Sequence, residues 1–88
     1  MRERAVLSRN EIVISGISTH NKAQEIVLNI RDIVESKGRN MVVFLEGSPG
    51  PFGEGICLRI SIKGDPLNAN EVRSLAKYLS IAGFDVHY

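Results

Sequence analysis

The sequence predicts an α+β fold: a ferredoxin-like βαββαβ plait, in which a four-stranded antiparallel sheet carries two helices on one face. Three observations predict it. Two segments carry apolar residues at intervals of three and four, which is the period of a helix. Short β-branched or alternating segments stand before and after each of them. A glycine flanks both helical segments on each side, so the chain reads as two β-α-β halves of similar layout.

The first half begins with Ile12–Ile14, a β-branched run typical of a strand. Asn21 then precedes Gln24 at the spacing of a capping box, which predicts the start of a helix. Lys37-Gly38 suits the end of that helix, because a cation favours the last carbonyls and glycine tolerates the left-handed cap. Met41–Leu45 is expected to form the next strand.

The second half begins with Ile56–Lys63, which alternates between apolar and other residues and predicts a strand with one buried face. The helix that follows has two possible starts. Asp65 could cap it with Pro66 in the first turn, or Asn68 could cap it with Glu71 three residues later. Residues 84–88 form the last expected strand. In a plait the first and third strands are central.

Residues 47–55 contain four glycines and two prolines, and we interpret them as the hairpin connection between the halves. Their glycines could cradle a phosphate, but the segment lacks the Gly-Lys-Ser/Thr ending of a nucleotide-binding loop. Phe52 within it is predicted to be displayed to a partner. On the sheet face away from the helices we expect Cys57, Arg59, Ser61 and Lys63. Arg59 and Lys63 could contact phosphate there or simply keep that face soluble.

Length and composition bound the class of protein. Eighty-eight residues suit a single domain over 11–88, with residues 1–10 as an N-terminal tail or an extra strand. A formal charge of +1 disfavours a dedicated binder of duplex DNA. The single cysteine fits a reducing compartment, and no apolar run reaches membrane length, so the sequence predicts a cytoplasmic protein without a membrane partner.

The sequence does not predict an enzyme. No nucleophile, base and orienting group form a set, and neither His20 nor His87 has partners at the spacing of metal ligands. We therefore expect no catalytic residue, no metal and no cofactor.

Three segments in order resemble the small translation initiation factor family typified by eukaryotic factor one. Residues 4–10, leading into 12–17, are similar to its basic N-terminal hairpin and strand-Gly. Phe52-Gly53-Glu54 stands before an apolar strand, and Ile62-Lys63-Gly64-Asp65 precedes a helix that ends at Ala82-Gly83-Phe84. The chain departs from the family at Gly38-Arg39-Asn40, where the family has a Gly-rich turn and a threonine. The family's hairpin loop is also more basic than residues 8–11, and the Pro-rich insertion here is longer. The resemblance implies contacts with ribosomal RNA through Arg2, Arg4, Arg9 and the 47–55 segment.

Two functions remain open at this stage. The first is a non-catalytic module that binds RNA or the ribosome through the basic N-terminus, the open sheet face and the Gly/Pro segment. The second is a protein-interaction or oligomerisation domain that uses the open face or an edge strand. The candidate binding residues are Arg4, Arg9, Phe52, Arg59 and Lys63.

Overall fold

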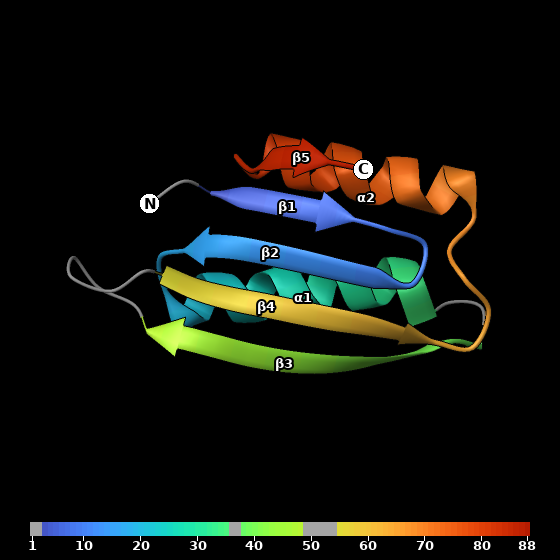
Figure 1. Ribbon diagram of the computed structural model, residues 1–88, viewed down its shortest axis with the longest axis horizontal. Helices are drawn as coiled ribbons and strands as arrows, with labels where there is room; N and C mark the ends of the chain where they lie inside the picture. The colour runs from blue at the N-terminus through green and yellow to red at the C-terminus, as the bar shows by residue number, and fades with distance from the viewer. Residues whose placement is uncertain (1–2, 36–37, 49–54) are drawn as a thin grey trace.

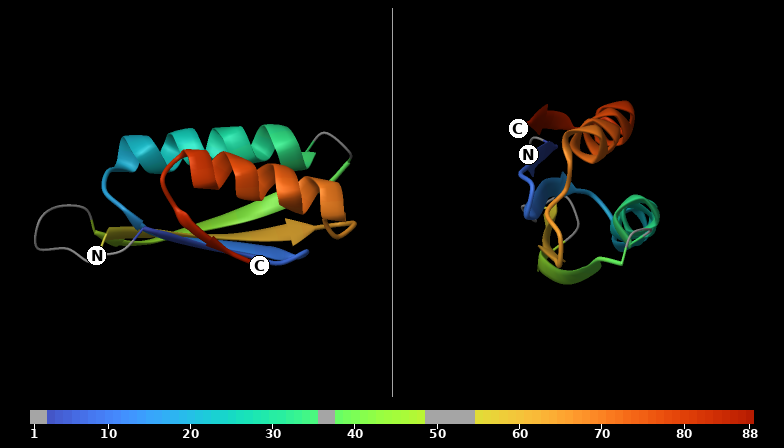
Figure 2. Two further views of the ribbon diagram at one scale, coloured as in Figure 1. Left: turned by 90° about the horizontal axis from the view of Figure 1, so that it is seen from above. Right: turned by 90° about the vertical axis from the view of Figure 1, so that its right-hand side faces the viewer.

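The computed structural model describes residues 3–35, 38–48 and 55–88. They form a five-stranded mixed sheet with two helices packed on one face (Figures 1 and 2). In chain order the elements are β1 (Arg4–Leu7), β2 (Glu11–Ile17), α1 (His20–Val34), β3 (Asn40–Ser48), β4 (Gly55–Lys63), α2 (Ala69–Ile81) and β5 (Asp85–His87).

The strand order is β3-β4-β2-β1-β5, so the predicted four-stranded antiparallel plait is wrong, although the α+β class is confirmed. The difference is β1, which pairs antiparallel with β2 and parallel with β5, and so lies between two strands that would be neighbours in a plait. Its burial alternates as in a strand with one covered face: Ala5 and Leu7 are buried, while Arg4 and Val6 are exposed. Within residues 1–10, the segment Arg4–Leu7 thus takes the form of an extra strand.

A tight turn at Ser8-Arg9-Asn10 makes the β1–β2 hairpin possible. The Ser8 backbone N–H donates to the Glu11 carbonyl at 2.8 Å, and the Glu11 N–H donates to Ser8 Oγ at 3.0 Å. The turn is also tied to the second half of the chain. Ile62 N donates to the Asn10 carbonyl, and Leu67 N donates to the Arg9 carbonyl, both at 2.8 Å. The hairpin is therefore part of the sheet and not an appendage.

The first helix begins two residues earlier than Asn21 predicts. Thr19 is its N-cap, in extended conformation, and Thr19 Oγ1 accepts a hydrogen bond from Lys22 N at 3.1 Å. Asn21 already lies inside the first turn, so the predicted capping box at Asn21 is wrong. The helix ends at Val34, with Glu35 as its C-cap; Lys37, expected near this end, lies outside the described residues.

The second helix begins at the later of its two predicted starts. Asn68 Oδ1 accepts from Glu71 N at 2.8 Å, and Glu71 Oε1 accepts from Asn68 N at 2.9 Å. Both hydrogen bonds of a capping box are thus present. They satisfy two of the backbone N–H groups that would otherwise lack partners at the start of the helix. A cross-helix bond then joins the two helices, because Asn29 Nδ2 donates to the Tyr78 hydroxyl at 3.0 Å.

The core lies between the sheet and the helices. The alternation predicted for Ile56–Lys63 is confirmed: Ile56, Leu58, Ile60 and Ile62 are buried, and the residues between them face away from the helices. Full burial of each such side chain contributes about 1.5–3 kcal/mol. In β2 the pairing register shifts between Ile14 and Ile17, where Gly16 adopts a φ of 78°. This bulge keeps both isoleucines buried despite their odd spacing.

A buried ion pair connects the two halves at the end of the sheet near the β1–β2 turn. Arg39, just before β3, donates through Nη2 to Glu71 Oε1 at 2.6 Å and through Nη1 to Glu71 Oε2. Its Nε donates to the Asp65 carbonyl at 2.8 Å, and Nη1 also reaches the Val34 carbonyl. Hydrogen bonding to Glu71 raises the pKa of Arg39 above its ordinary value, so this guanidinium stays charged at every working pH.

We expect this pair to act as a unit. Arg39→Met leaves a buried carboxylate with one partner fewer, and Glu71→Gln leaves a buried guanidinium without its counter-charge, so each single variant lowers the urea midpoint of unfolding. The double variant Arg39→Met/Glu71→Gln removes both charges and keeps the glutamine that a capping box accepts, so it loses less stability than the two single losses combined. Losses that simply add would contradict the coupling.

Candidate nucleic-acid interface

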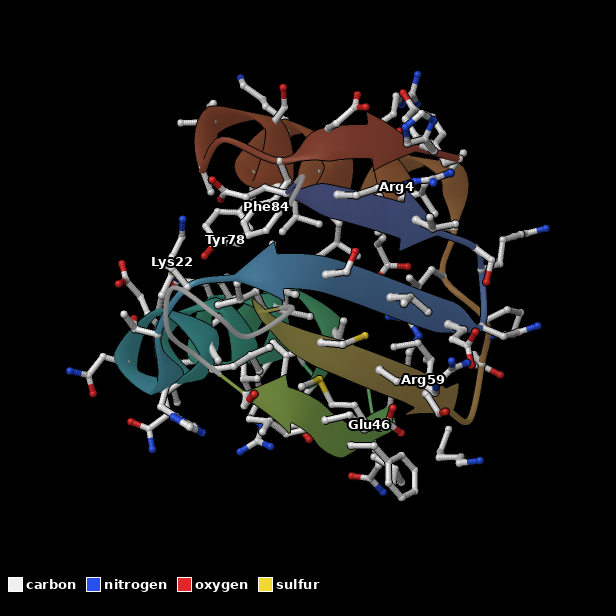
Figure 3. The ribbon with its side chains drawn as sticks, turned by 60° about the vertical axis from the view of Figure 1, so that its left-hand side comes forward. Arg4, Lys22, Glu46, Arg59, Tyr78 and Phe84 are labelled. Carbon is white, nitrogen blue, oxygen red and sulfur yellow. The ribbon has the colours of Figure 1, made fainter. Side chains whose placement is uncertain are left out.

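The structure does not bring together the four predicted binding residues that it describes. Arg4, Arg59 and Lys63 lie on the open sheet face, on β1 and β4, and β2 separates Arg4 from Arg59 (Figure 3). Arg9 lies in the β1–β2 turn, and Phe52 is outside the described residues. The prediction therefore divides into an open-face group and a separate Arg9.

Acidic residues lie beside two of the three cations of the open face. Arg59 Nη1 lies 3.4 Å from Glu11 Oε2, and Arg4 is the register partner of Asp85. Phe44, 55% exposed on β3, is the register partner of Arg59. Of the three open-face cations, Arg59 alone is in an ion pair between described residues, and exposed apolar groups such as Phe44 share this face.

Arg9 is held in place by the loop that leads into α2. Its Nε donates to the Leu67 carbonyl at 2.9 Å, while the Arg9 carbonyl accepts from Leu67 N. Leu67 itself is fully buried, so the turn is anchored to the core through one residue. One edge of the guanidinium is used for this contact, and its Nη atoms make no hydrogen bond among the described residues.

Beside Arg9, two adjoining hollows run along α2. One, of about 420 Å³, is lined by Arg9, Ala69, Val72, Arg73 and Tyr88. The other, of about 550 Å³, shares Arg73 and Tyr88 with the first and extends past Lys77 to Phe84 and Val86 of the C-terminal segment. We call the two together the α2 groove. Its polar and aromatic lining consists of Arg9, Arg73, Lys77, Ser80, Phe84, Asp85 and Tyr88.

The α2 groove is positively charged. Arg73 and Lys77 are the only exposed charged residues of α2, because its one acidic residue, Glu71, is buried against Arg39. None of the ion pairs between described residues involves Arg9, Arg73 or Lys77. The single carboxylate in the lining, Asp85, lies 3.1 Å from His87 Nε2. Three cations thus line the two adjoining hollows, against one carboxylate.

Tyr88 adds an aromatic surface to these cations. It is 77% exposed and borders both hollows. Guanidinium groups bind phosphate oxygens through a fork of donors, and an exposed ring can stack on an unpaired base. Cations and a ring side by side are the combination that single-stranded nucleic acid requires.

Sequence reasoning identified only Arg9 of this group. Arg73 and Lys77 carry a readable signal, since they stand one helical turn apart on a segment whose only acid occupies the capping-box position. Tyr88 carries none, because its place beside α2 depends on how β5 pairs.

Other classes of site find no support in the part of the chain that the structure describes. It contains no cluster of three or more His, Cys, Asp or Glu residues that could hold a metal ion. No described helix has the length and apolar character needed to cross a membrane. A scan against models of protein families and searches of curated proteins and solved structures found no match to this chain.

The anchoring of Arg9 gives a stability test. Arg9→Ala removes the bond from Nε to the Leu67 carbonyl, so we expect the free energy of unfolding to fall by about 0.5–1.5 kcal/mol. Arg73→Ala, a matched truncation of an exposed groove arginine, should change it by no more than about 0.5 kcal/mol. Urea titration followed by circular dichroism measures both. Equal losses would show that Arg9 has no anchoring role.

Proposed function

We propose that this domain is a non-catalytic RNA-binding module and that the α2 groove is its contact surface. The observation that carries the proposal is the grouping of Arg9, Arg73 and Lys77 around the exposed ring of Tyr88, without ion-pair partners among the described residues. In this proposal the three cations contact phosphates and Tyr88 stacks on a base.

The N-terminal hairpin supports ribosomal RNA as the class of partner. The resemblance to the initiation factor family implies a basic hairpin at this position and an RNA contact through Arg9. A plain four-stranded plait has no place for such a hairpin, whereas β1 and β2 form one here, with Arg9 in its turn. The hairpin and the α2 groove meet at Arg9, so one RNA segment could contact both.

The groove favours unpaired nucleotides over a duplex. Duplex RNA is recognised mainly by shape across its wide minor groove, whereas unpaired bases stack on aromatic side chains. The exposed Tyr88 ring suits the second mode, and a formal charge of +1 gives little attraction for a long duplex.

Two double variants, each of which removes two positive charges, show which surface contacts the RNA. Arg73→Ala/Lys77→Ala removes two groove cations, and Arg59→Ala/Lys63→Ala removes two open-face cations. We expect the groove variant to weaken binding of a single-stranded ribosomal RNA fragment by roughly tenfold or more. The logarithm of the association constant falls as the logarithm of the salt concentration rises, and this slope should become shallower by roughly 1.4, because two phosphate contacts are lost. Fluorescence anisotropy across a salt series measures both quantities.

The open-face variant is the control, and we expect it to retain most of the affinity because Arg59 is already paired with Glu11. Loss of binding in the open-face variant alone would move the interface to the sheet. Binding that is absent, or insensitive to salt, would contradict the proposed function.

The role of the ring is tested separately at Tyr88. Tyr88→Ala removes a stacking surface worth about 1–3 kcal/mol per base, so we expect the RNA dissociation constant to rise by roughly 5- to 150-fold. Tyr88→Phe keeps the ring and should bind like the parent chain. A Phe variant as weak as the Ala variant would assign the effect to the hydroxyl group and not to stacking.

A further inference from the structure

The two edges of the sheet differ in how they are protected. The β5 edge has three residues and carries Asp85 and His87, and short, charged strands are a common way to block pairing with another chain. The β3 edge has nine residues, of which Met41–Leu45 are consecutively apolar. No strand among the described residues pairs with the outer side of β3.

Both faces of β3 expose apolar side chains. On the open face, Val42 is 39% and Phe44 55% exposed. On the helix face, α1 lies behind β4 in Figure 1, and while Met41 is buried, Leu45 is 47% exposed. A hollow of about 340 Å³ remains there, lined mainly by apolar residues of α1, β3 and β4 that include Leu28 and Leu45. Such a surface is typical of an interface.

We propose that β3 pairs antiparallel with β3 of a second copy of this chain, about a two-fold axis at Val43. The sequence of the strand carries the choice of partner, because it is self-complementary in this register. The axis places Val42 opposite Phe44 of the partner subunit on the open face. It places Met41 opposite Leu45 of the partner subunit on the helix face. It also places Asn40 opposite Glu46 of the partner subunit, so apolar residues meet apolar residues and polar residues meet polar residues.

Neighbouring registers lack this match. Directly opposite residues of an antiparallel pair lie on the same face of the sheet. The two-fold axis must therefore pass through a residue, and the nearest alternatives to Val43 are Phe44 and Val42. An axis at Phe44 would place Val42 opposite Glu46 of the partner subunit, and an axis at Val42 would place Asn40 opposite Phe44 of the partner subunit. The register at Val43 is therefore the one that pairs apolar residues only with apolar residues throughout Met41–Leu45.

A two-fold pairing also closes the assembly. The same strand is used by both copies, so no further copy can add at that edge, and the joined sheet ends on a short β5 at each side. The apolar hollows of the two copies become continuous between the two α1 helices. The α2 groove lies near the opposite edge of the sheet, so the proposed dimer leaves it exposed.

A charge-pair experiment tests both the interface and its register. Sedimentation velocity across a concentration series should show a monomer–dimer equilibrium for the parent chain. Val42→Lys and Phe44→Glu each place a charge opposite an apolar residue twice per dimer, and each should weaken dimerisation by roughly tenfold or more. The double variant Val42→Lys/Phe44→Glu places lysine opposite glutamate in both positions and should recover most of the loss, as should an equimolar mixture of the two single variants.

Ile81→Lys is the matched control, since Ile81 is 77% exposed on α2, away from β3, and should leave dimerisation unchanged. Circular dichroism melting of every variant separates loss of dimer from loss of fold. A parent chain that stays monomeric at every concentration overturns the proposal, as would be expected if another protein occupied this edge. A dimer insensitive to both single variants, or a double variant as weak as the singles combined, overturns the proposed interface or its register.

Discussion

One buried guanidinium group ties together three segments from the two halves of this protein. Arg39 satisfies the Val34 carbonyl at the end of α1, the Asp65 carbonyl in the loop after β4, and the carboxylate that caps α2. A buried arginine is costly unless all its donors are used, so this arrangement tolerates little displacement of α2. The position of α2 in turn fixes where Arg73 and Lys77 lie relative to the β1–β2 turn. The candidate RNA surface therefore depends on a contact that no RNA would touch.

The second determinant is the hairpin. Because β1 lies between β2 and β5, the sheet is one strand wider than a plait, and the C-terminal segment is carried to the edge beside α2. Arg9 and Tyr88, which are distant in sequence, then border the same hollow. The anchoring of Arg9 through Leu67 joins this hollow to the core. The α2 groove lies beside the β5 edge of the sheet, and β3 is the opposite edge, so the two proposed surfaces can act independently.

Local signals predicted much of the fold. The alternation of Ile56–Ile62 and the capping box at Asn68 involve neighbours in sequence, and both are confirmed. The insertion of β1 depends on its pairing with β5, which no local pattern encodes. Thr19 and Asn21 are both good caps, so only the observed backbone separates them. Cations are usually exposed, whereas Arg39 is buried. Its burial depends on Glu71, which is 32 positions away, so no local pattern predicts it. The site was mostly missed because Arg9 and Tyr88 come to lie beside Arg73 and Lys77 only in the folded chain.

The pairing of β1 with β5 also shapes the order in which this chain can fold. β5 has no other neighbour in the sheet, and its partner β1 lies near the opposite end of the sequence. The hairpin forms by closing a short loop, whereas bringing β5 to β1 closes a loop that spans nearly the whole domain, at a larger entropic cost. Non-local contacts of this kind slow folding. Pairing of β5 with β1 thus has the largest entropic cost of loop closure in the sheet. The α2 groove forms only when β5 is paired.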